Sequence, residues 1–559
     1  MTVHEILTQF RSHEVPRSLE IFAPEILLCV TIVFMLLVRM TGWNRRLPVN
    51  LVALIGALIV FIGVFAQFMF LRVGNESNVL KALYDIWHLT PAHTGTVGPY
   101  FGGLMTHDVF AVFFRLGLGL FLVFVIALTI LTGIPDEEDG QDFYTLLLGA
   151  TLGMMLAAGS NHLLMLFLAV EMMSVPSYAM VGFQKGRRQA SEAALKYVIY
   201  GAGAAGVMLY GISLLAGLCG TASLPELANR ITVVMGDSTL AQTNATSVTL
   251  LLAILMIFAG LAFKLSLFPF HFWCPDAFEG ASAEVGGFLS VASKAASFAL
   301  LVRFSLALTG GTVFLQQLCL TLGIALGVVA IVTMTYGNLA AYMQNNLKRL
   351  LAYSTIAHAG YMVMAVSALM VLMSDRGEAA TRMNPDAIGC LEGLMYYLAV
   401  YIFMNLGAFA CIALIRNETF SEEIEAYRGL IKGNAVTQLL CICLACCFFS
   451  LIGLPPTGGF FGKLAIFNSA LRAGHVHWFL WVVFGFGAVN TVISLFYYLR
   501  VLKEIFISEP VQETRRLAFP GVGAAYVALI TLPVILLGAT SMMAYLSSTA
   551  QYVAASLLR

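Results

Sequence analysis

The sequence predicts an all-α polytopic membrane protein with about 14 transmembrane helices. Of its 559 residues, 60% are hydrophobic and only 11% are charged, whereas soluble globular chains carry about 25% charged residues. Apolar segments of about 20 residues, the length that crosses a bilayer as a helix, recur along the whole chain. This composition excludes a disordered chain and an ordinary soluble enzyme. Lys and Arg balance Asp and Glu at 30 each, so no basic excess is available for binding nucleic acid.

The expected spans follow one another closely, and the longest polar connections cover 73–107 and 220–247. The first span begins near Ile21, after a segment with no small-residue cleavage site, so a removable signal peptide is not expected. The expected spans are 22–41, 50–72, 108–132, 142–159, 162–183, 192–219, 248–273, 285–308, 313–336, 347–373, 389–415, 434–471, 477–502 and 520–546.

Basic residues are divided unevenly between the two sides of the expected bundle. Fourteen Lys and Arg residues lie in one set of connections and nine on the opposite side, which includes both termini. Because basic residues favour the cytoplasmic side of a membrane, the richer set is expected there, and both termini are expected outside. The richer set is Arg45, Arg46, Lys185, Arg187, Arg188, Lys348, Arg349, Arg416, Arg428, Lys432, Arg500, Lys503, Arg515 and Arg516.

Five ionisable side chains stand inside the expected spans. Lys264, Lys294 and Lys463 lie deep, Lys196 lies about two turns inside its helix, and Glu171 stands mid-span. Each such group costs at least ~2.5–3.5 kcal/mol at the bilayer centre, so five of them on separate helices favour a pathway over a purely structural role. Lysine suits a proton pathway because it can release its proton when buried, whereas arginine stays charged.

Proline interrupts two of the expected spans. Pro269 lies in AFKLSLFPFHFW, and Pro455 and Pro456 lie in FSLIGLPPTGGFFGK. Interior proline removes a backbone donor and frees the carbonyl four residues earlier, and in lipid such a break persists only where protein or water satisfies the freed groups. Lys264 and Lys463 each lie within about 8–11 Å of a break along a helix. A break beside a buried charge, found twice, is typical of an internally repeated transporter.

The chain is expected to consist of four segments, two of which each contain one broken span. The blocks 142–308 and 309–505 each contain five spans, and in each block the fourth span is the discontinuous one. Because five crossings end on the opposite side of the membrane, the two blocks are expected to be inverted repeats. A three-helix segment, 1–141, precedes them, and a C-terminal helix within 506–559 follows them.

Six stretches of the chain carry a resemblance to a known family. They are ALKYVIYGAGAAGVMLYG (194–211), FKLSLFPFHFWCPDAFEGA (263–281), FLSVASKAASFALLVRF (288–304), NLKRLLAYSTIAHAGYMVM (346–364), YYLAVYIFMNLGAFA (396–410) and IGLPPTGGFFGKLAIF (452–467). They resemble subunit N of proton-translocating NADH–quinone oxidoreductase, respiratory complex I, over about residues 20 to 546. The sibling antiporter-like subunits L and M differ around Lys294, and the long lateral helix of subunit L is not expected here.

The resemblance implies a proton-translocating membrane-arm subunit that is driven by redox chemistry in other subunits. The chain would carry no redox cofactor of its own, and its partners would be protons, the lipid bilayer and the other membrane subunits of the complex. It would be a multi-pass protein of the bacterial inner membrane. A subunit of a multi-subunit sodium/proton antiporter is one alternative, and a structural scaffold with vestigial charges is another.

The resemblance also assigns expected roles to particular positions. Glu171 would modulate Lys264, Lys294 would link the two halves, and Lys463 would be the terminal lysine near the exit. The positions that match the family's proton pathway are Glu171, Lys196, Lys264, Lys294, His358 and Lys463.

Two acidic residues do not fit the family pattern. Where that pattern reads EGAPTP, this chain reads EGASAE, which places Glu284 ten residues before Lys294. We expect Glu284 to face a loop and to be inert, and altered proton uptake is the alternative. Glu392, at the start of the eleventh span, has no explanation in the sequence.

No further motif in the sequence supports a cofactor or metal site. No GxGxxG opens a helix after a strand, so nicotinamide or flavin binding is not expected. The four cysteines of CICLACCFF (441–449) lie in an apolar run without His or carboxylate, so we expect them to act as small hydrophobic residues. His475 and His477 have no third ligand beside them and are expected to be solvated.

Overall fold

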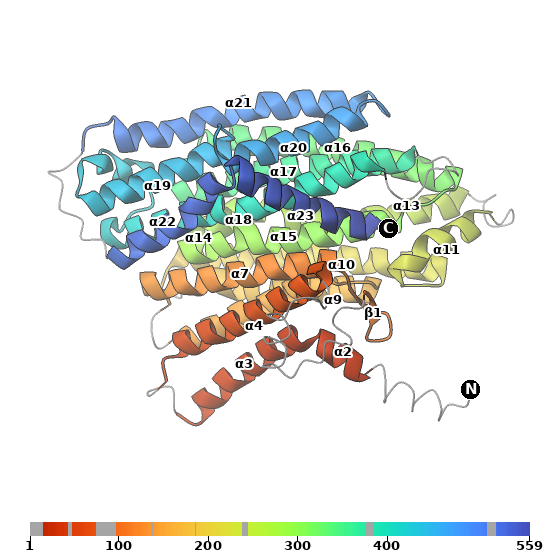
Figure 1. Ribbon diagram of the computed structural model, residues 1–559, viewed down its shortest axis with the longest axis horizontal. Coiled ribbons are helices and arrows are strands. Elements are labelled where there is room, and N and C mark those ends of the chain that lie inside the picture. Colours follow the sequence, from red (N-terminus) through yellow and green to blue (C-terminus); the bar gives the residue numbers. More distant parts are fainter. Residues whose placement is uncertain are drawn as a thin grey trace.

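The computed structural model describes residues 15–42, 47–73, 97–135, 139–184, 186–236, 244–375, 384–510 and 521–558. Most helices run along the long axis of the molecule as one bundle (Figure 1). The helices are α2 (Val15–Ile21), α3 (Ala23–Met40), α4 (Val49–Val73), α7 (Val109–Thr132), α8 (Gly140–Ala158), α9 (Leu163–Val181), α10 (Arg188–Cys219), α11 (Leu224–Gly236), α13 (Asn244–Leu265), α14 (Trp273–Gly280), α15 (Ala283–Ala307), α16 (Val313–Ala341), α17 (Leu347–Ser374), α18 (Pro385–Thr419), α19 (Ala435–Ile452), α20 (Gly458–Ala473), α21 (Phe479–Phe506), α22 (Gly521–Leu536) and α23 (Thr540–Leu558), with 3₁₀ turns η4 (Ile424–Tyr427) and η5 (Leu430–Lys432).

Each of the 14 expected spans contains a helix, although not every helix meets the requirement for crossing a bilayer. In the described residues, 12 helices are long and apolar enough to do so, and 13 if the pair α22–α23, bent by 78°, is one span. Helix α8 occupies the expected span 142–159 but is not among the 12, because Gln141 and Asp142 lower the mean hydropathy of its first turn. The polytopic all-α prediction is confirmed.

Both predicted helix breaks are present. Helix α13 ends at Leu265 and α14 begins at Trp273, after a turn that contains Pro269. Helix α19 ends at Ile452 and α20 begins after Pro455 and Pro456, so the expected span 434–471 is two helices. The inverted relation of the two blocks and their boundaries stay predictions.

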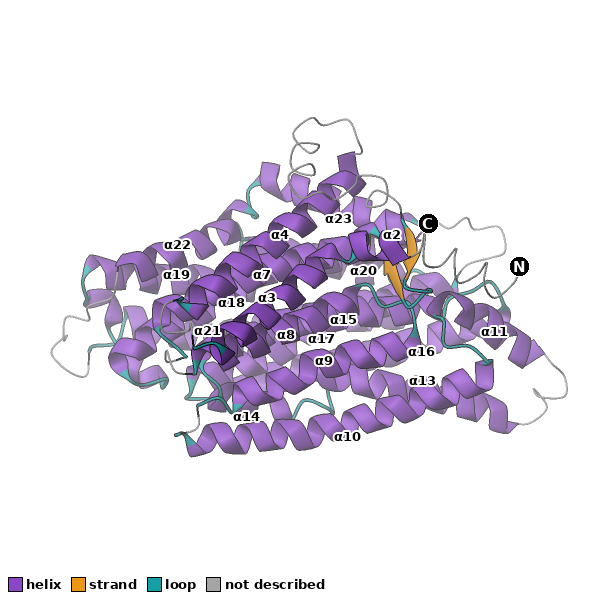
Figure 2. Ribbon diagram, turned by 90° about the horizontal axis from the view of Figure 1, so that it is seen from below, coloured by secondary structure: helices purple, strands orange, loops and turns teal. Residues whose placement is uncertain are grey.

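The expected connections contain some regular structure. Strand β1 (Gly98–Tyr100) pairs antiparallel with β2 (Met105–His107), and both lie beside α2 (Figure 2). Helix α11 lies within the expected connection 220–247. The remainder of the long connections, 74–96 and 237–243, lies outside the described residues. So do five residues of the richer basic set, which are Arg45, Arg46, Lys185, Arg515 and Arg516, and five of the nine on the opposite side, which are Arg11, Lys81, Arg376, Arg382 and Arg559.

Three helices form the centre of the bundle. The apolar window of α17 is buried over its full length, and those of α15 and α18 are 94% and 83% buried, whereas the windows of α10 and α21 are only 28% buried. Helix α21 lies at one edge of the bundle and α3 at the opposite edge (Figure 1). Lys294 on α15 and Lys348 and His358 on α17 are accordingly buried.

Candidate functional site

Three of the predicted lysines are fully buried on a row of packed helices. Lys264 of α13, Lys294 of α15 and Lys463 of α20 are exposed by 0%, 1% and 3%. Helix α13 packs on α15, α15 on α17, and α17 on α20. His358, on α17, is also buried. The structure thus places these groups inside the bundle, and α17 lies between Lys294 and Lys463 in the order of packing.

At the second break, the freed carbonyls hold the lysine. The Lys463 ammonium donates to the carbonyl oxygens of Leu451 and Ile452, each at 2.9 Å. These carbonyls lie four residues before Pro455 and Pro456, which cannot donate a backbone N–H to them. The carbonyl end of a helix carries partial negative charge, so the end of α19 is a cation site made by the proline pair.

At the first break, the freed carbonyl holds a lysine from another helix. The Lys294 ammonium donates to the carbonyl of Leu265, four residues before Pro269, at 3.1 Å. It also donates to the carbonyl of Thr355 on α17 at 3.1 Å. Lys294 therefore joins the end of α13 to the central helix.

Lys264 lies one residue before that carbonyl, among aromatic side chains. Its ammonium donates to the hydroxyl of Tyr197 at 3.1 Å and lies 5.9 Å and 5.5 Å from the ring centroids of Tyr178 and Tyr197, within cation–π range. Glu171, half-buried on α9, interacts electrostatically with Lys264. In the described structure no direct ion pair joins the two, so Glu171 acts on Lys264 through space.

His358 and Tyr397 occupy the position between Lys294 and Lys463. His358 follows Thr355 by three residues on α17, and its Nδ1 lies 2.5 Å from the Tyr397 hydroxyl. The Tyr397 ring lies against Gly462, where an added Cβ would stand 2.5 Å from a ring carbon. Because Gly462 precedes Lys463, the absence of a side chain there lets the Tyr397 ring lie beside the terminal lysine's helix.

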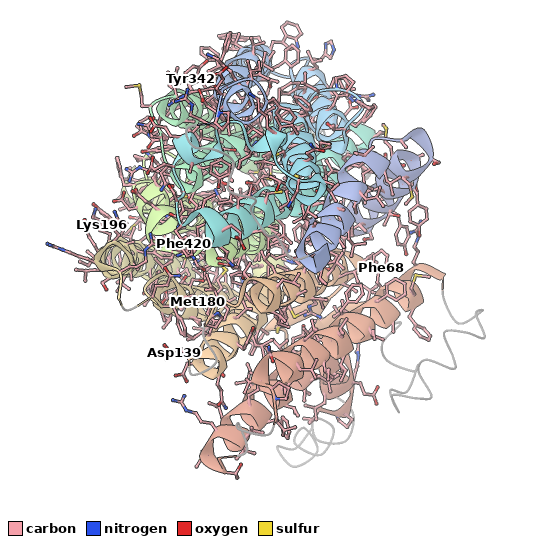
Figure 3. All side chains as sticks on the ribbon, turned by 90° about the vertical axis from the view of Figure 1, so that its left-hand side faces the viewer. Phe68, Asp139, Met180, Lys196, Tyr342 and Phe420 are labelled. Atoms are coloured by element: carbon pink, nitrogen blue, oxygen red, sulfur yellow. The ribbon has the colours of Figure 1, made fainter. Side chains whose placement is uncertain are left out.

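Lys196 is not part of this buried row, and the structure does not bring it together with the other predicted pathway residues. Its side chain is 42% exposed and forms ion pairs with Glu192 at 2.9 Å and Asp276 at 2.8 Å. Figure 3 shows it at the periphery of the molecule. Helix α10 begins at Arg188, well before the apolar run, so two turns into the helix is still at its polar end.

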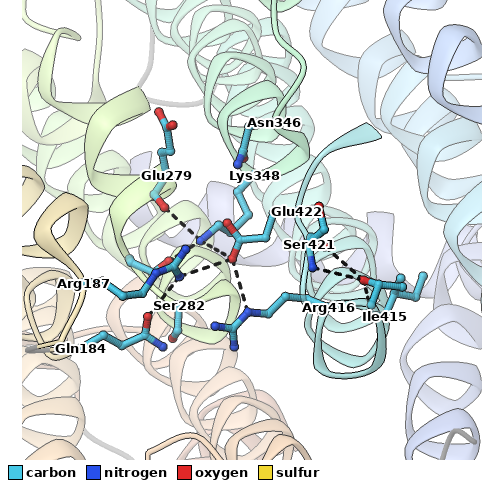
Figure 4. Close-up of polar contacts among 12 residues, drawn as sticks. Gln184, Arg187, Glu279, Ser282, Asn346, Lys348, Ile415, Arg416, Ser421 and Glu422 are labelled. Carbon is cyan, nitrogen blue, oxygen red and sulfur yellow. Dashed lines mark hydrogen bonds and ion pairs between the residues drawn. The ribbon is translucent and has the colours of Figure 1, made fainter. Parts of the chain in front are cut away.

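A second group of charges, which we call the end cluster, consists of Arg187, Lys348, Arg416 and Glu422 (Figure 4). Lys348 is buried and donates to the Glu422 carboxylate at 2.9 Å and to the carbonyl of Ala281 at 2.5 Å. Arg187 and Arg416 lie 3.7 Å and 3.6 Å from the same carboxylate. The end cluster ties α17 to the chain that joins α14 and α15, and it gathers basic residues that the sequence placed on one side.

The two unexplained acids have defined places. Glu284 is 1% exposed in the first turn of α15, so the expectation that it faces a loop is wrong. Glu392 accepts a hydrogen bond from Ser547 of α23 and lines a cavity of about 560 Å³ together with Tyr396 and Asn468. Glu392 thus anchors the C-terminal helix to α18.

The sequence did not indicate which neutral and acidic side chains contact the basic and imidazole groups. Tyr197, Tyr397, Asp276 and Glu422 each bond a basic or imidazole side chain. For the tyrosines a signal existed, since a tyrosine hydroxyl inside an apolar span needs a hydrogen-bond partner. In the part of the chain that the structure describes, no group of three or more His, Cys, Asp or Glu side chains is arranged to hold a metal ion.

Comparison with known proteins places the chain in a family. Residues 160–494 match the family model for the transmembrane region of NADH:quinone oxidoreductase/Mrp antiporter subunits. The NADH-quinone oxidoreductase subunit N of Anaeromyxobacter sp. (strain Fw109-5) is 43% identical over 423 residues, which are 73% of this chain and 77% of that relative.

Two solved structures share the architecture. A chain of respiratory complex I from Thermus thermophilus, solved with bound aureothin, superposes with a TM-score of 0.68 at 28% identity, covering 92% of this chain and 96% of that one. A chain of the Mrp complex from Dietzia sp. DQ12-45-1b superposes with a TM-score of 0.70 at 18% identity, covering 97% and 100%, and shows the fold alone. Because the family model covers residues 160–494 and a subunit N relative is 43% identical over 73% of the chain, the chain belongs to the subunit N family of NADH–quinone oxidoreductase, an antiporter-like family of membrane subunits.

Proposed function

We propose that this chain translocates protons as a membrane-arm subunit of an NADH–quinone oxidoreductase. The observation that carries the proposal is the pairing of the lysines with the broken helices. Lys294 and Lys463 each donate to carbonyls that a proline has freed from helical hydrogen bonding. A buried ammonium is costly unless it is paired, and these carbonyls supply partners without supplying a fixed negative charge. Such a site can hold either a charged or a neutral lysine.

The row of groups supports proton transfer in the plane of the membrane. A proton that leaves Lys264 reaches Lys294, whose amine accepts it and becomes an ammonium held by the Leu265 and Thr355 carbonyls. From there it passes through His358 and the Tyr397 hydroxyl, each of which both accepts and donates a proton, to Lys463. Water is expected to bridge the steps between groups that do not touch. A change in the distance between the Glu171 carboxylate and Lys264 loads or unloads the first lysine by Coulomb interaction.

The energy for this cycle comes from redox chemistry in other subunits. The solved complex from Thermus thermophilus that this chain resembles is a respiratory complex I, so the proposed partners are the other membrane subunits of such a complex. We propose no redox cofactor in this chain, a location in a bacterial inner membrane and both termini on the outer side.

A sodium/proton antiporter subunit is the competing function, because the matching family model covers both classes. A scaffold with vestigial charges is opposed by the continuous row from Lys264 to Lys463. The deciding experiment measures NADH-driven proton uptake by vesicles that contain the assembled complex, at several sodium concentrations. Lys264→Ala should abolish uptake and leave assembly intact, and the exposed Lys432→Ala serves as the matched control. Uptake that requires sodium, or a Lys264→Ala complex that pumps normally, would contradict the proposal.

A further inference from the structure

Glu284 is a buried carboxylate that the proposed relay does not yet use. It lies in the first turn of α15, it is 1% exposed, and among the described residues neither carboxylate oxygen has a hydrogen-bond donor. The N-terminus of a helix favours an anion by about 0.3–1 kcal/mol, which is less than the cost of burying an unpaired carboxylate. The buried carboxylate of Glu422, by contrast, has the Lys348 ammonium beside it. Glu284 is instead a site that a proton can occupy.

The surroundings of Glu284 connect it to the end of the bundle that carries the end cluster. Lys348 of that cluster donates to the carbonyl of Ala281, three residues before Glu284. On the neighbouring helix α8, Tyr144 interacts electrostatically with Glu284, and its hydroxyl lies 3.1 Å from the hydroxyl of Thr129. Glu284 therefore lies just inside the end of the membrane domain, within electrostatic range of a pair of hydroxyls that can carry a proton.

A polar path continues from Glu284 toward Lys294 on the same helix. Ser290 accepts a hydrogen bond from the Asn405 amide of α18 at 2.6 Å, and the amide oxygen of Asn405 has no partner in the described structure. The hydroxyl of Ser293 also lacks one. Glu284 and Lys294 are ten residues apart, which is about 15 Å along a helix, and Ser290 lies between them.

Two phenylalanine rings pack against α15 between Glu284 and Ser290. The side chain of Phe409, one turn from Asn405 on α18, lies against the backbone of Gly286 and Gly287, where added Cβ atoms would stand 3.0 Å from a ring carbon and 3.2 Å from the Phe409 Cβ. Phe278 of α14 packs against the same ring, with centroids 5.9 Å apart. We call Phe278 and Phe409 the phenylalanine plug. Gly286 and Gly287 lie between Glu284 and Ser290 on α15, so the plug packs on the stretch of helix that a proton moving from Glu284 toward Ser290 would have to pass.

We propose that Glu284 is a proton-uptake residue that loads Lys294 when the phenylalanine plug opens. The carboxylate takes a proton from water at the end of the bundle and becomes a carboxylic acid. When the plug opens, water connects it past Ser290 and Asn405 to the neutral amine of Lys294. The acid gives up its proton, the amine becomes an ammonium, and the Glu284 carboxylate is restored. This inference rests on the proposed function, because it requires Lys294 to carry protons.

The test compares Glu284→Gln with Glu284→Asp in the assembled complex, reconstituted in vesicles. The glutamine variant keeps the shape but cannot carry a proton, so NADH-driven proton uptake should fall by about tenfold or more, while the aspartate variant should retain most of it. Glu423→Gln, an exposed acid near the same end of the molecule, is the matched control and should behave as the parent does. Normal uptake in Glu284→Gln would overturn the inference.

Two further variants, Phe409→Ala and Lys264→Ala, distinguish the possible outcomes of this test. If Glu284→Gln assembles poorly, Phe409→Ala is measured instead, and it should raise the passive proton leak of the vesicles. A leak equal to that of the parent would overturn the inference. Lys264→Ala is assayed in parallel. If it abolishes uptake while the Glu284 variants are normal, only this inference fails, and if all variants pump normally, the proposed function fails too.

Discussion

The substitution Gly462→Ala should interrupt the relay without removing any ionisable group. An added Cβ would stand 2.5 Å from a Tyr397 ring carbon and 3.3 Å from the Tyr397 Cα. Since the α18 backbone is also close, the ring cannot simply rotate away, and either the ring or the helix must shift by about 1 Å to reach ordinary van der Waals distance.

The magnitude follows from the neighbouring hydrogen bond. A shift of about 1 Å would lengthen the 2.5 Å contact between His358 and the Tyr397 hydroxyl beyond the range of a good hydrogen bond. Misplacement of a reacting group by about 1 Å can reduce a rate by about 100-fold, and overpacking should cost about 1–3 kcal/mol of stability. We therefore expect a severe loss of proton translocation in a complex that still assembles.

The assay is NADH-driven proton uptake per assembled complex, together with a thermal unfolding curve of the purified complex. Gly485→Ala is the matched control, since an added Cβ at this helical glycine of α21 meets nothing within 4 Å. Tyr397→Phe removes only the hydroxyl and should cause a comparable loss, and the double variant should be little worse than either single one because both act on one contact. If Gly462→Ala pumps at the parental rate, the contact between His358 and Tyr397 does not carry the proton.

Substitutions at three further positions test other parts of the structure. Lys264→Arg should pump far more slowly than its conserved charge suggests, because arginine does not deprotonate; a parental rate of proton uptake would make Lys264 a fixed counter-charge. Glu171→Gln should reduce uptake severely and Glu171→Asp mildly, since only the latter keeps the charge that acts on Lys264; equal rates in both variants would exclude this electrostatic role. Arg115→Leu should destabilise the protein by about 3–5 kcal/mol, seen in denaturant unfolding, because it leaves the buried Glu25 carboxylate without its ion pair at 2.9 Å; an unchanged midpoint would mean that the pair contributes little.

The features predicted well from the sequence are those with a local chemical cause. A proline inside an apolar run breaks a helix wherever the chain folds, so both breaks are where Pro269 and Pro455 indicate. A lysine in such a run must find partners inside the protein, so the burial of Lys294 and Lys463 follows from their positions alone.

The features that the sequence did not predict depend on where distant segments pack. Lys196 is two turns into a helix, but only the position of Asp276 on α14 shows that this part of α10 is an exposed, charged end. Lys348 lies in the first turn of α17 and is nevertheless fully buried, because Glu422 from beyond α18 pairs with it. Glu284 follows a turn, and the packing of α8 and α18 against the start of α15 removes it from solvent. No local pattern contains this information.

Both helix breaks contain proline, but the lysine that the freed carbonyls bind comes from a different place in each. This difference affects how a movement in one half changes the other. At the second break the freed carbonyls hold Lys463, which belongs to the helix that follows the same break. At the first break the freed carbonyl of Leu265 accepts a hydrogen bond from Lys294 of α15. Lys264, the residue before Leu265, instead donates to the Tyr197 hydroxyl. A movement of the end of α13 therefore changes the surroundings of Lys264 and Lys294 together.

Lys294 is consequently the junction of the two halves. Its ammonium spans the end of α13 and the Thr355 carbonyl of α17, and His358 on the same face of α17 begins the path to Lys463. When Lys294 loses its proton, both carbonyls lose a charged donor, and the hydrogen bonds that hold α13 to α17 weaken from charge-assisted to neutral strength, which is roughly a factor of two. The protonation state of one side chain thus sets how firmly the first break is held against the central helix. The end of α13 is therefore held most weakly, and can move most easily, at the step when Lys294 passes its proton from one half to the other.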